Sequence, residues 1–214
     1  MRVAIVDYGS GNLCSAEKAF ERAGQDHPSP VEVVVTSEAE VVAQADRVVL
    51  PGVGAFADCR DGLRAVDGMV EALEEVALKK ARPFLGICVG MQLLADRGLE
   101  YGTHDGLGWI GGEVRAIETG DPRRKIPHMG WNALSIAESP ANLFAGIDDG
   151  AFVYFVHSYG FVPTDPAHIM ATVDYGPAIV AALGRDNLVG TQFHPEKSQA
   201  VGLGFIANFL AWTP

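Results

Sequence analysis

Residues 84–92 read Phe84-Leu85-Gly86-Ile87-Cys88-Val89-Gly90-Met91-Gln92. The apolar run predicts a buried strand, and it leads directly into the pattern Gly-x-Cys-x-Gly. Small residues two positions before and after a cysteine allow a sharp turn from strand to helix, which exposes the cysteine at the edge of a sheet. An isolated cysteine is usually a small buried apolar residue, but the flanking glycines favour a nucleophile. The N–H groups at the helix start also favour the thiolate of Cys88.

A cysteine nucleophile needs a base and a group that orients the base. The segment Gln192-Phe193-His194-Pro195-Glu196 offers both. On an extended segment, residues two apart point the same way, so Glu196 can hold the tautomer of His194, and Pro195 stiffens this arrangement. Alone, the segment would more simply be a surface His-Pro turn. Together with Cys88 it predicts a catalytic His194 and Glu196.

Acyl transfer also needs N–H donors for the negative charge that develops on the substrate oxygen. The N–H of Val89, which follows the nucleophile, is the usual first donor. A second can come from the loop that follows the apolar run 48–50, where Val53 lies between Gly52 and Gly54. The same loop could be an ordinary turn. We predict an oxyanion hole formed by Val53 and Val89.

The rest of the chain alternates strand and helix patterns in its first half, which is typical of parallel βαβ units. The second half is denser in strands, and its Gly and Pro residues indicate hairpins added to one side of the sheet. The expected strands are 3–6, 31–35, 48–50, 84–87, 152–156, 169–173, 179–183 and 188–193, and the expected helices are 13–23, 69–80 and 201–212. We therefore predict an α/β fold with a central, mostly parallel sheet flanked by helices, and further antiparallel strands in the second half.

Composition narrows the class of protein. The 214 residues are 48% hydrophobic with no break in composition, which predicts one domain over residues 1–214. A net charge of −11 argues against a nucleic-acid partner. The N-terminal apolar run is short and stops at Asp7, as a strand does and a signal sequence does not, and no run reaches transmembrane length. The 3 cysteines suit a reducing cytoplasm.

Neither a metal nor a cofactor is predicted. The cysteines and the other histidines lack the spacing of a zinc site. The glycines of Asp7-Tyr8-Gly9-Ser10-Gly11-Asn12-Leu13-Cys14 suggest a dinucleotide fingerprint, but Cys14 stands where the third glycine is required. Gly9 and Gly11 therefore predict a tight turn.

The two catalytic motifs together resemble the class I, triad-type glutamine amidotransferases. Further segments are similar to one branch of that family, the glutaminase subunits of imidazole glycerol phosphate synthase in histidine biosynthesis. These segments are Leu50-Pro51-Gly52-Val53-Gly54-Ala55-Phe56, Ile126-Pro127-His128-Met129-Gly130-Trp131-Asn132, Tyr154-Phe155-Val156-His157-Ser158-Tyr159 and His194-Pro195-Glu196-Lys197-Ser198. They extend over nearly the whole chain, and the resemblance implies a flavodoxin-like fold.

The resemblance also implies roles for individual residues. Cys88 would be the nucleophile, His194 the general base and acid, and Glu196 the group that orients His194. Residues in contact with the bound glutamine would be Gly52, Gln92, Glu100, Ser158 and Tyr159. Without the resemblance, Gln92 and Glu100 would be interpreted as solvated residues on a helix face.

In the branch that these segments resemble, ammonia passes to a cyclase subunit, which is a (β/α)₈ barrel, and the two subunits form a heterodimer. Ammonia that escaped into water would be protonated and lose its nucleophilic lone pair. The resemblance implies that Asn12, Met129, Trp131, Tyr154 and Lys197 face this partner. The alternatives are core packing for the apolar members and a solvated charge for Lys197.

Regulation is suggested by the glycines on either side of Val53. We hypothesise that the partner switches on the glutaminase by reorienting the Gly52-Val53-Gly54 backbone, which Gly52→Pro would block without unfolding the chain. Two alternatives to this function remain. One is the same triad serving anthranilate, aminodeoxychorismate, guanylate, carbamoyl phosphate or pyridoxal phosphate synthesis; the other is a non-enzymatic redox-sensing or interaction module.

Overall fold

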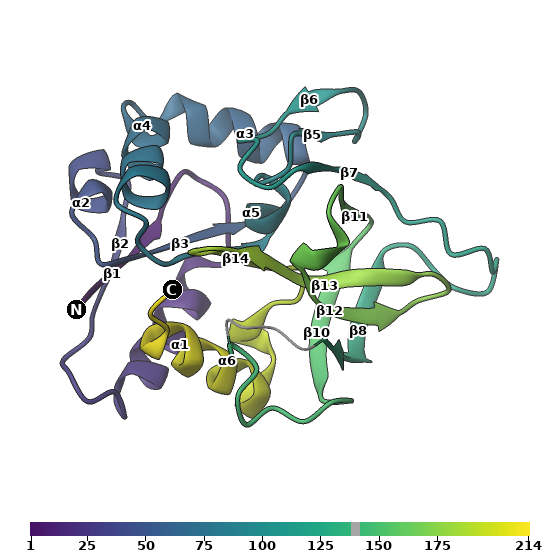
Figure 1. Cartoon of the computed structure of the whole chain (residues 1–214). Coiled ribbons are helices and arrows are strands. Elements are labelled where there is room, and N and C mark those ends of the chain that lie inside the picture. Colours follow the sequence, from purple (N-terminus) through teal and green to yellow (C-terminus); the bar gives the residue numbers. More distant parts are fainter. Residues whose placement is uncertain (138–141) are drawn as a thin grey trace.

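The computed structural model describes residues 1–137 and 142–214, and its centre is an eight-stranded sheet (Figure 1). In spatial order the strands are β2 (Glu32–Thr36), β1 (Arg2–Val6), β3 (Arg47–Gly52), β4 (Phe84–Cys88), β14 (Leu188–Thr191), β13 (Ala178–Arg185), β12 (Ile169–Asp174) and β9 (Ser135–Ile136). Neighbours from β2 to β14 are parallel, and those from β14 to β9 are antiparallel. The predicted fold class is confirmed.

Helices cover both faces of the parallel part of the sheet (Figure 1). On one face lie α1 (Leu13–Gly24) and α6 (Gln199–Ala211), and on the other lie α2 (Ala39–Ala43), α3 (Phe56–Ala65) and α4 (Met69–Glu74). The predicted helix 69–80 is present, but its second half, Glu75–Lys79, is a π-helix. The remaining helical elements of the described residues are two 3₁₀ turns, Pro166–His168 and Pro195–Lys197, and the short helix α5 (Val89–Gln92).

Two smaller sheets lie beside the central one. β8 (His128–Ala133) and β10 (Phe152–His157) form an antiparallel pair, which we call the β8–β10 ribbon. The other sheet joins β11 (Tyr159–Pro163), β7 (Gly112–Ala116), β5 (Arg97–Gly98) and β6 (His104–Asp105). The hairpin strands predicted for the second half are therefore only partly in the central sheet. Burial alternates along β10, which is typical of an antiparallel strand with one solvated face.

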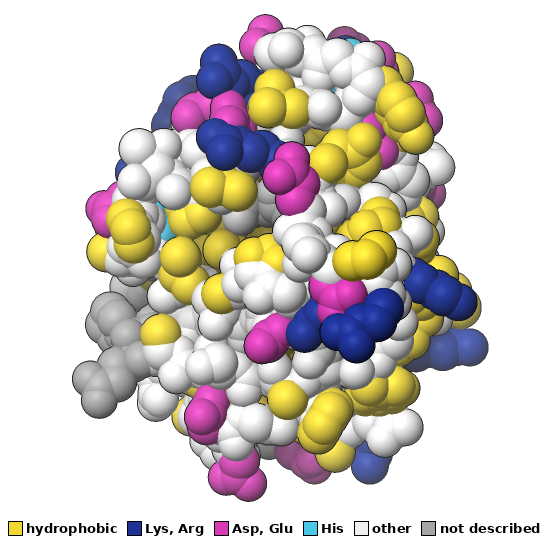
Figure 2. Space-filling model, turned by 90° about the vertical axis from the view of Figure 1, so that its right-hand side faces the viewer, with side chains coloured by type: hydrophobic (Ala, Val, Ile, Leu, Met, Phe, Trp, Pro, Cys, Tyr) yellow, Lys and Arg dark blue, Asp and Glu magenta, His cyan; other side chains and the backbone are white. Residues whose placement is uncertain are grey.

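Every residue of β3 and of β4 is buried, as expected for parallel strands covered on both faces. Within the described residues, no helix combines the length and the apolar character needed to cross a membrane. On the face that Figure 2 shows, Lys and Arg side chains lie next to Asp and Glu instead of forming a continuous basic patch.

Candidate active site

Cys88 lies at the turn between β4 and α5, where the sequence predicts a nucleophile elbow. Its φ of 55° is left-handed, a conformation that costs a non-glycine residue energy and occurs preferentially at functional sites. A Cβ atom added at Gly86 would lie 2.6 Å from the carbonyl oxygen of Gly90, and one added at Gly90 would collide with the carbonyl oxygen of Leu50. The predicted sharp turn is therefore present, and it needs both glycines.

His194 and Glu196 follow β14, which pairs with β4, so the carboxyl ends of two neighbouring strands bring them to Cys88. The Nδ1 atom of His194 lies 2.8 Å from Oε1 of Glu196, and both side chains are almost fully buried. The segment is not extended as predicted: Pro195 begins a 3₁₀ turn. The fixed φ of proline suits the first position of a helix, and the turn brings the carboxylate back to the imidazole.

The electrostatics of this group favour a charged imidazole. Burial alone lowers the pKa of His194, but Cys88 and the Glu196 carboxylate raise it more, and the resulting pKa is about 9. Among the described residues, Nε2 of His194 makes no hydrogen bond. A protonated imidazole beside the nucleophile has a proton to give to a leaving group.

A cavity of about 300 Å³ opens over these groups. It is the size of a small-molecule site. Eight of the predicted site residues line it, namely Val53, Cys88, Val89, Gln92, Glu100, Ser158, Tyr159 and His194. Gly52 lies beneath the elbow instead, since a Cβ added there would be 2.8 Å from the N atom of Gly90. Glu196 lies behind His194.

The interpretation of Gln92 and Glu100 as solvated helix-face residues is wrong. Gln92 is buried, and its Nε2 donates to the carbonyl of Tyr159 (3.0 Å) and to Oε1 of Gln192 (2.9 Å). Glu100 is partly buried outside any helix, and its Oε2 accepts the N–H of Phe56 at the start of α3 (2.7 Å). A carboxylate held at that place in the cavity can receive the ammonium group of an amino acid.

The two predicted oxyanion donors differ in this structure. Val89 is the first residue of α5, so its N–H has no acceptor within the helix. The N–H of Val53 donates to Oγ of Ser10 (3.1 Å), whose hydroxyl donates back to the carbonyl of Val53 (2.6 Å). Cys59 Sγ also donates to that carbonyl (3.3 Å). In this conformation Val53 does not offer its N–H to the cavity.

Gln192 and His157 were not predicted as site residues. Gln192 is fully buried, and its Nε2 lies 3.6 Å from Sγ of Cys88. His157 lines the cavity. Gln192 lies two residues before His194 in the catalytic motif, and His157 directly precedes Ser158, so position next to a motif was the available signal. The contacts of Gln192 with Gln92 and of His157 with His128, however, join positions 100 and 29 apart.

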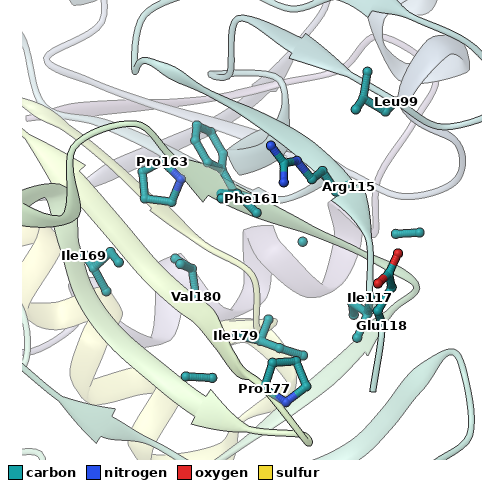
Figure 3. Close-up of a pocket in the computed structure, with 14 residues that line it drawn as sticks. Leu99, Arg115, Ile117, Glu118, Phe161, Pro163, Ile169, Pro177, Ile179 and Val180 are labelled. Atoms are coloured by element: carbon teal, nitrogen blue, oxygen red, sulfur yellow. The ribbon is translucent and has the colours of Figure 1, made fainter. Parts of the chain in front are cut away.

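A larger cavity of about 750 Å³ lies elsewhere, between the sheet of β7 and β11 and the strands β12 and β13. Figure 3 shows that Phe161, Pro163, Ile169 and Val180 contribute apolar surface to it, with Arg115 at one side. None of the predicted site residues lines it. It therefore does not compete with the smaller cavity as the place of the cysteine chemistry.

Four of the five residues expected at a partner interface, Met129, Trp131, Tyr154 and Lys197, lie on the β8–β10 ribbon or against it. Met129 is 61% exposed and Trp131 46%, so core packing is wrong for both. Trp131 lies opposite Tyr154 in the ribbon, with ring centroids 6.0 Å apart, and Lys197 Nζ lies 5.9 Å from the Tyr154 ring centroid. Asn12, partly buried, directly precedes α1.

No group of three or more His, Cys, Asp or Glu side chains in residues 1–137 and 142–214 is arranged to hold a metal ion.

We expect acidification to destabilise the fold through two buried histidines. Burial and, to a smaller extent, the charge of Arg124 lower the pKa of His128 to about 4. Burial likewise lowers the pKa of His157 to about 4. In the unfolded chain both histidines have the ordinary pKa of 6.5, so between pH 6.5 and pH 4 the unfolded chain binds more protons than the folded one. The stability that the two neutral histidines contribute above pH 6.5 is therefore lost as the pH falls towards 4.

At pH 5 the loss is on the order of 2 kcal/mol for His157, and the loss for His128 has the same sign. Urea unfolding at pH 7 and pH 5 measures this loss, and the double variant His128→Asn, His157→Asn should show a smaller one. Equal losses in the two proteins would contradict the assignment.

The contribution of His194 to stability depends on pH in the opposite direction. It is complete below pH 6.5 and is lost as the pH rises through about 9.

Comparisons with known proteins agree with this geometry. The family model described as glutamine amidotransferase class-I matches residues 4–211. Three similar proteins are each called "Imidazole glycerol phosphate synthase subunit HisH". They come from Rhodospirillum rubrum (66% identical over 214 residues, covering 100% of both chains), Brucella melitensis (59% over 217 residues, 100% of both) and Caulobacter vibrioides (53% over 212 residues, 99% of both).

Solved structures share the fold at lower identity. The glutaminase domain of Trypanosoma brucei CTPS with bound acivicin has a TM-score of 0.68 at 20% identity, covering 100% of this chain and 95% of that one. A glutamine amidotransferase from Thermotoga maritima has a TM-score of 0.63 at 20% identity, covering 92% and 76%. Since the family model spans almost the whole chain and includes the cavity residues, this chain belongs to the class-I glutamine amidotransferase family.

Proposed function

We propose that this chain is the glutaminase subunit of an imidazole glycerol phosphate synthase, acting as one domain of residues 1–214 in the cytoplasm. The observation that carries the chemistry is the placement of Cys88, His194 and Glu196 at the carboxyl ends of the paired strands β4 and β14. The observation that carries the pathway is the printed name of relatives that are 53% to 66% identical over the full length.

The proposed reaction begins when Sγ of Cys88 attacks the side-chain carbonyl carbon of glutamine. The negative charge on the carbonyl oxygen is received by the N–H of Val89 and, once it is free, the N–H of Val53. His194 gives its proton to the leaving nitrogen, so ammonia departs and a thioester remains. Water, deprotonated by His194, then cleaves the thioester and releases glutamate. Glu196 stabilises the imidazolium through the bond to Nδ1.

The glutamine would be held by groups on the cavity wall. Glu100 and Oε1 of Gln92 are acceptors for its ammonium, and the Ser158–Tyr159 backbone with Gly52 shapes the rest of the site. The buried pair of His194 and Glu196 favours this enzyme over a redox-sensing module, because such a module needs no carboxylate to orient a base. The identity of the relatives favours histidine biosynthesis over the other amidotransferase pathways.

The partner would be a (β/α)₈-barrel cyclase subunit that forms a heterodimer with this chain and uses the ammonia to make imidazole glycerol phosphate and aminoimidazole carboxamide ribotide. Its docking surface would be formed by Met129, Trp131, Tyr154, Lys197 and Asn12. Exposed aromatic and methionine side chains suit the core of an interface. One of the two strands, β10, reaches the cavity through Val156 and His157, so the cavity lies beside this surface.

The test is glutamate release from glutamine by the purified chain, by itself and with a cyclase subunit that is loaded with its nucleotide ligand. We expect strong stimulation by the cyclase, and none by the synthase subunits for anthranilate or guanylate. Stimulation by one of those subunits instead would reject the pathway, and glutamate release that the cyclase leaves unchanged would reject the partner.

Regulation of this site would depend on the bonds that hold Val53. The variant Gly52→Pro is not a clean test, because any side chain at Gly52 would collide with Tyr8 and with the N atom of Gly90. The bonds between Ser10 and Val53 are a better target, since they keep the Val53 N–H away from the cavity.

We expect Ser10→Ala to raise the glutaminase activity of the chain without its partner by about tenfold. The variant loses hydrogen bonds that together contribute about 1 kcal/mol or somewhat more, so the Val53 peptide is free to turn. Glutamate release without the partner measures the effect. Ser37→Ala, on an exposed loop, is the matched control. An unchanged basal rate in Ser10→Ala would show that these bonds do not restrain the site.

A further inference from the structure

A pair of buried histidines occupies the inner face of the β8–β10 ribbon. His128 and His157 lie opposite each other on the two strands, and Nδ1 of His128 is 3.0 Å from Nε2 of His157. The ring of His128 stacks on Phe155 and packs against Tyr175, with centroid distances of 4.8 and 4.1 Å. Packing on both sides fixes the orientation of this ring.

The neighbours of the pair determine where its protons lie. Nδ1 of His157 is 2.8 Å from the carbonyl oxygen of Tyr159, which can only accept, so Nδ1 carries a proton. At the other end, Nδ2 of Asn132 donates to the carbonyl of Asp174 and lies 3.2 Å from Nε2 of His128, which therefore accepts. Every bond is satisfied when both imidazoles are neutral and protonated at Nδ1. A second proton on either ring would set donor against donor.

The chain of bonds continues from Tyr159 to the nucleophile. The carbonyl of Tyr159 accepts a second hydrogen bond from Nε2 of Gln92, at 3.0 Å. The same nitrogen donates to Oε1 of Gln192, and Nε2 of Gln192 lies 3.6 Å from Sγ of Cys88. Both N–H groups of Gln92 are thus used inside the protein. Only its Oε1 remains for a ligand in the cavity, and its orientation depends on the Tyr159 carbonyl.

Resting on the proposed glutaminase function, we propose that the His128–His157 pair is a positioning element for the reaction. It holds the Tyr159 carbonyl in place, so that Gln92 presents an acceptor to the substrate and Gln192 presents a donor to Sγ of Cys88. Neither histidine takes part in proton transfer, because all four ring nitrogens are occupied by bonds of fixed direction. Burial, which lowers the pKa of both rings, keeps them neutral at neutral pH.

Two replacements of His157 separate positioning from packing. In His157→Asn, the side-chain amide nitrogen can take the place of Nδ1 and donate to Tyr159, whereas His157→Leu keeps the bulk and removes the donor. The readout on the purified chain is the rate at which 6-diazo-5-oxo-L-norleucine, a glutamine-shaped electrophile, labels Cys88, divided by the rate for iodoacetamide. This ratio reports how well the cavity aligns a glutamine-like molecule with the thiolate.

We expect His157→Leu to lower the ratio by about 100-fold, as small misplacements of reacting groups do. His157→Asn should restore most of it, and His27→Leu, in the loop after α1, should match the parent chain. A wild-type ratio in His157→Leu, or an equally low ratio in His157→Asn, would overturn the proposal. If iodoacetamide labels Cys88 of the parent chain but the diazoketone does not, even with the cyclase subunit present, the glutaminase function itself is rejected, and the positioning role with it.

A spectroscopic measurement tests the arrangement without any activity. Long-range ¹H–¹⁵N correlation spectra distinguish the two neutral tautomers and the charged form of each imidazole. At pH 7 we expect His128 and His157 both as neutral rings protonated at Nδ1. A ring protonated at Nε2, or a charged ring, would overturn the bond directions on which the positioning role depends, and it would do so even if the chain proved to be an active glutaminase.

Discussion

Replacing Cys88 with alanine is expected to lower kcat for glutamate release from glutamine by about 10⁴-fold or more. Without Sγ no thioester forms, and the rest of the site can only bind glutamine next to water. Binding should survive, because Glu100 and Gln92 remain in the cavity. The measurement is steady-state glutamate production by the chain with the proposed cyclase subunit, with glutamine affinity determined separately by calorimetry.

The matched control is Cys14→Ala, which removes an exposed thiol from α1 and should leave glutamate production by the chain near the parent rate. Cys59→Ala is less suitable, since Cys59 contributes to the bonds around Val53. Glutamate release by Cys88→Ala within tenfold of the parent would mean that another group activates water, and the cysteinyl thioester would have to be given up.

The elements that sequence patterns predicted are those with a strong local signal. β4 is a continuous apolar run because it is buried on both faces, and α1 and α6 carry an apolar face against the sheet. β7, β8 and β11 were not predicted, since glycines and exposed side chains interrupt their patterns. They are strands because of what they pair with, and pairing is a long-range property that a local pattern does not contain.

The same distinction between local and long-range signals applies to the candidate site. The elbow around Cys88 follows from steric limits on neighbouring residues, so Gly86 and Gly90 were sufficient to predict it. The bond between Gln92 and Gln192 joins positions 100 apart, and that between Ser10 and Val53 joins positions 43 apart. Such contacts depend on the order of strands in the sheet. The sequence alone therefore predicted which groups react, and not what holds them.

One local prediction was also wrong, and for a physical reason. The pairing of His194 with Glu196 was argued from the period of an extended strand, but Pro195 starts a 3₁₀ turn there. An extended strand and a 3₁₀ turn can each bring the side chains of residues i and i+2 close to each other. The turn has an additional effect, because Oγ of Ser198 donates to the carbonyl of His194 (2.7 Å) and also accepts the N–H of Tyr154 (3.0 Å). The base is thus connected directly to the β8–β10 ribbon.

Glu196→Gln is expected to lower kcat by about 10²- to 10⁴-fold while leaving the fold intact, because the amide is the same size as the carboxylate and can still accept from Nδ1. What the change removes is the negative charge beside the imidazole. The pKa of His194, which Cys88 and Glu196 together raise to about 9, should fall. The imidazolium that donates to the leaving nitrogen then becomes less stable.

Loss of the Glu196 charge should change the pH profile in a way that a packing defect would not. The alkaline limb of kcat/KM reports deprotonation of His194 in the free enzyme, so it should move to lower pH in Glu196→Gln. Glu71→Gln, on the exposed surface of α4, removes the same charge far from the site and should leave the limb in place. If the rate falls while the alkaline limb stays where it is in the parent, Glu196 acts by holding the orientation of His194 and not through its charge.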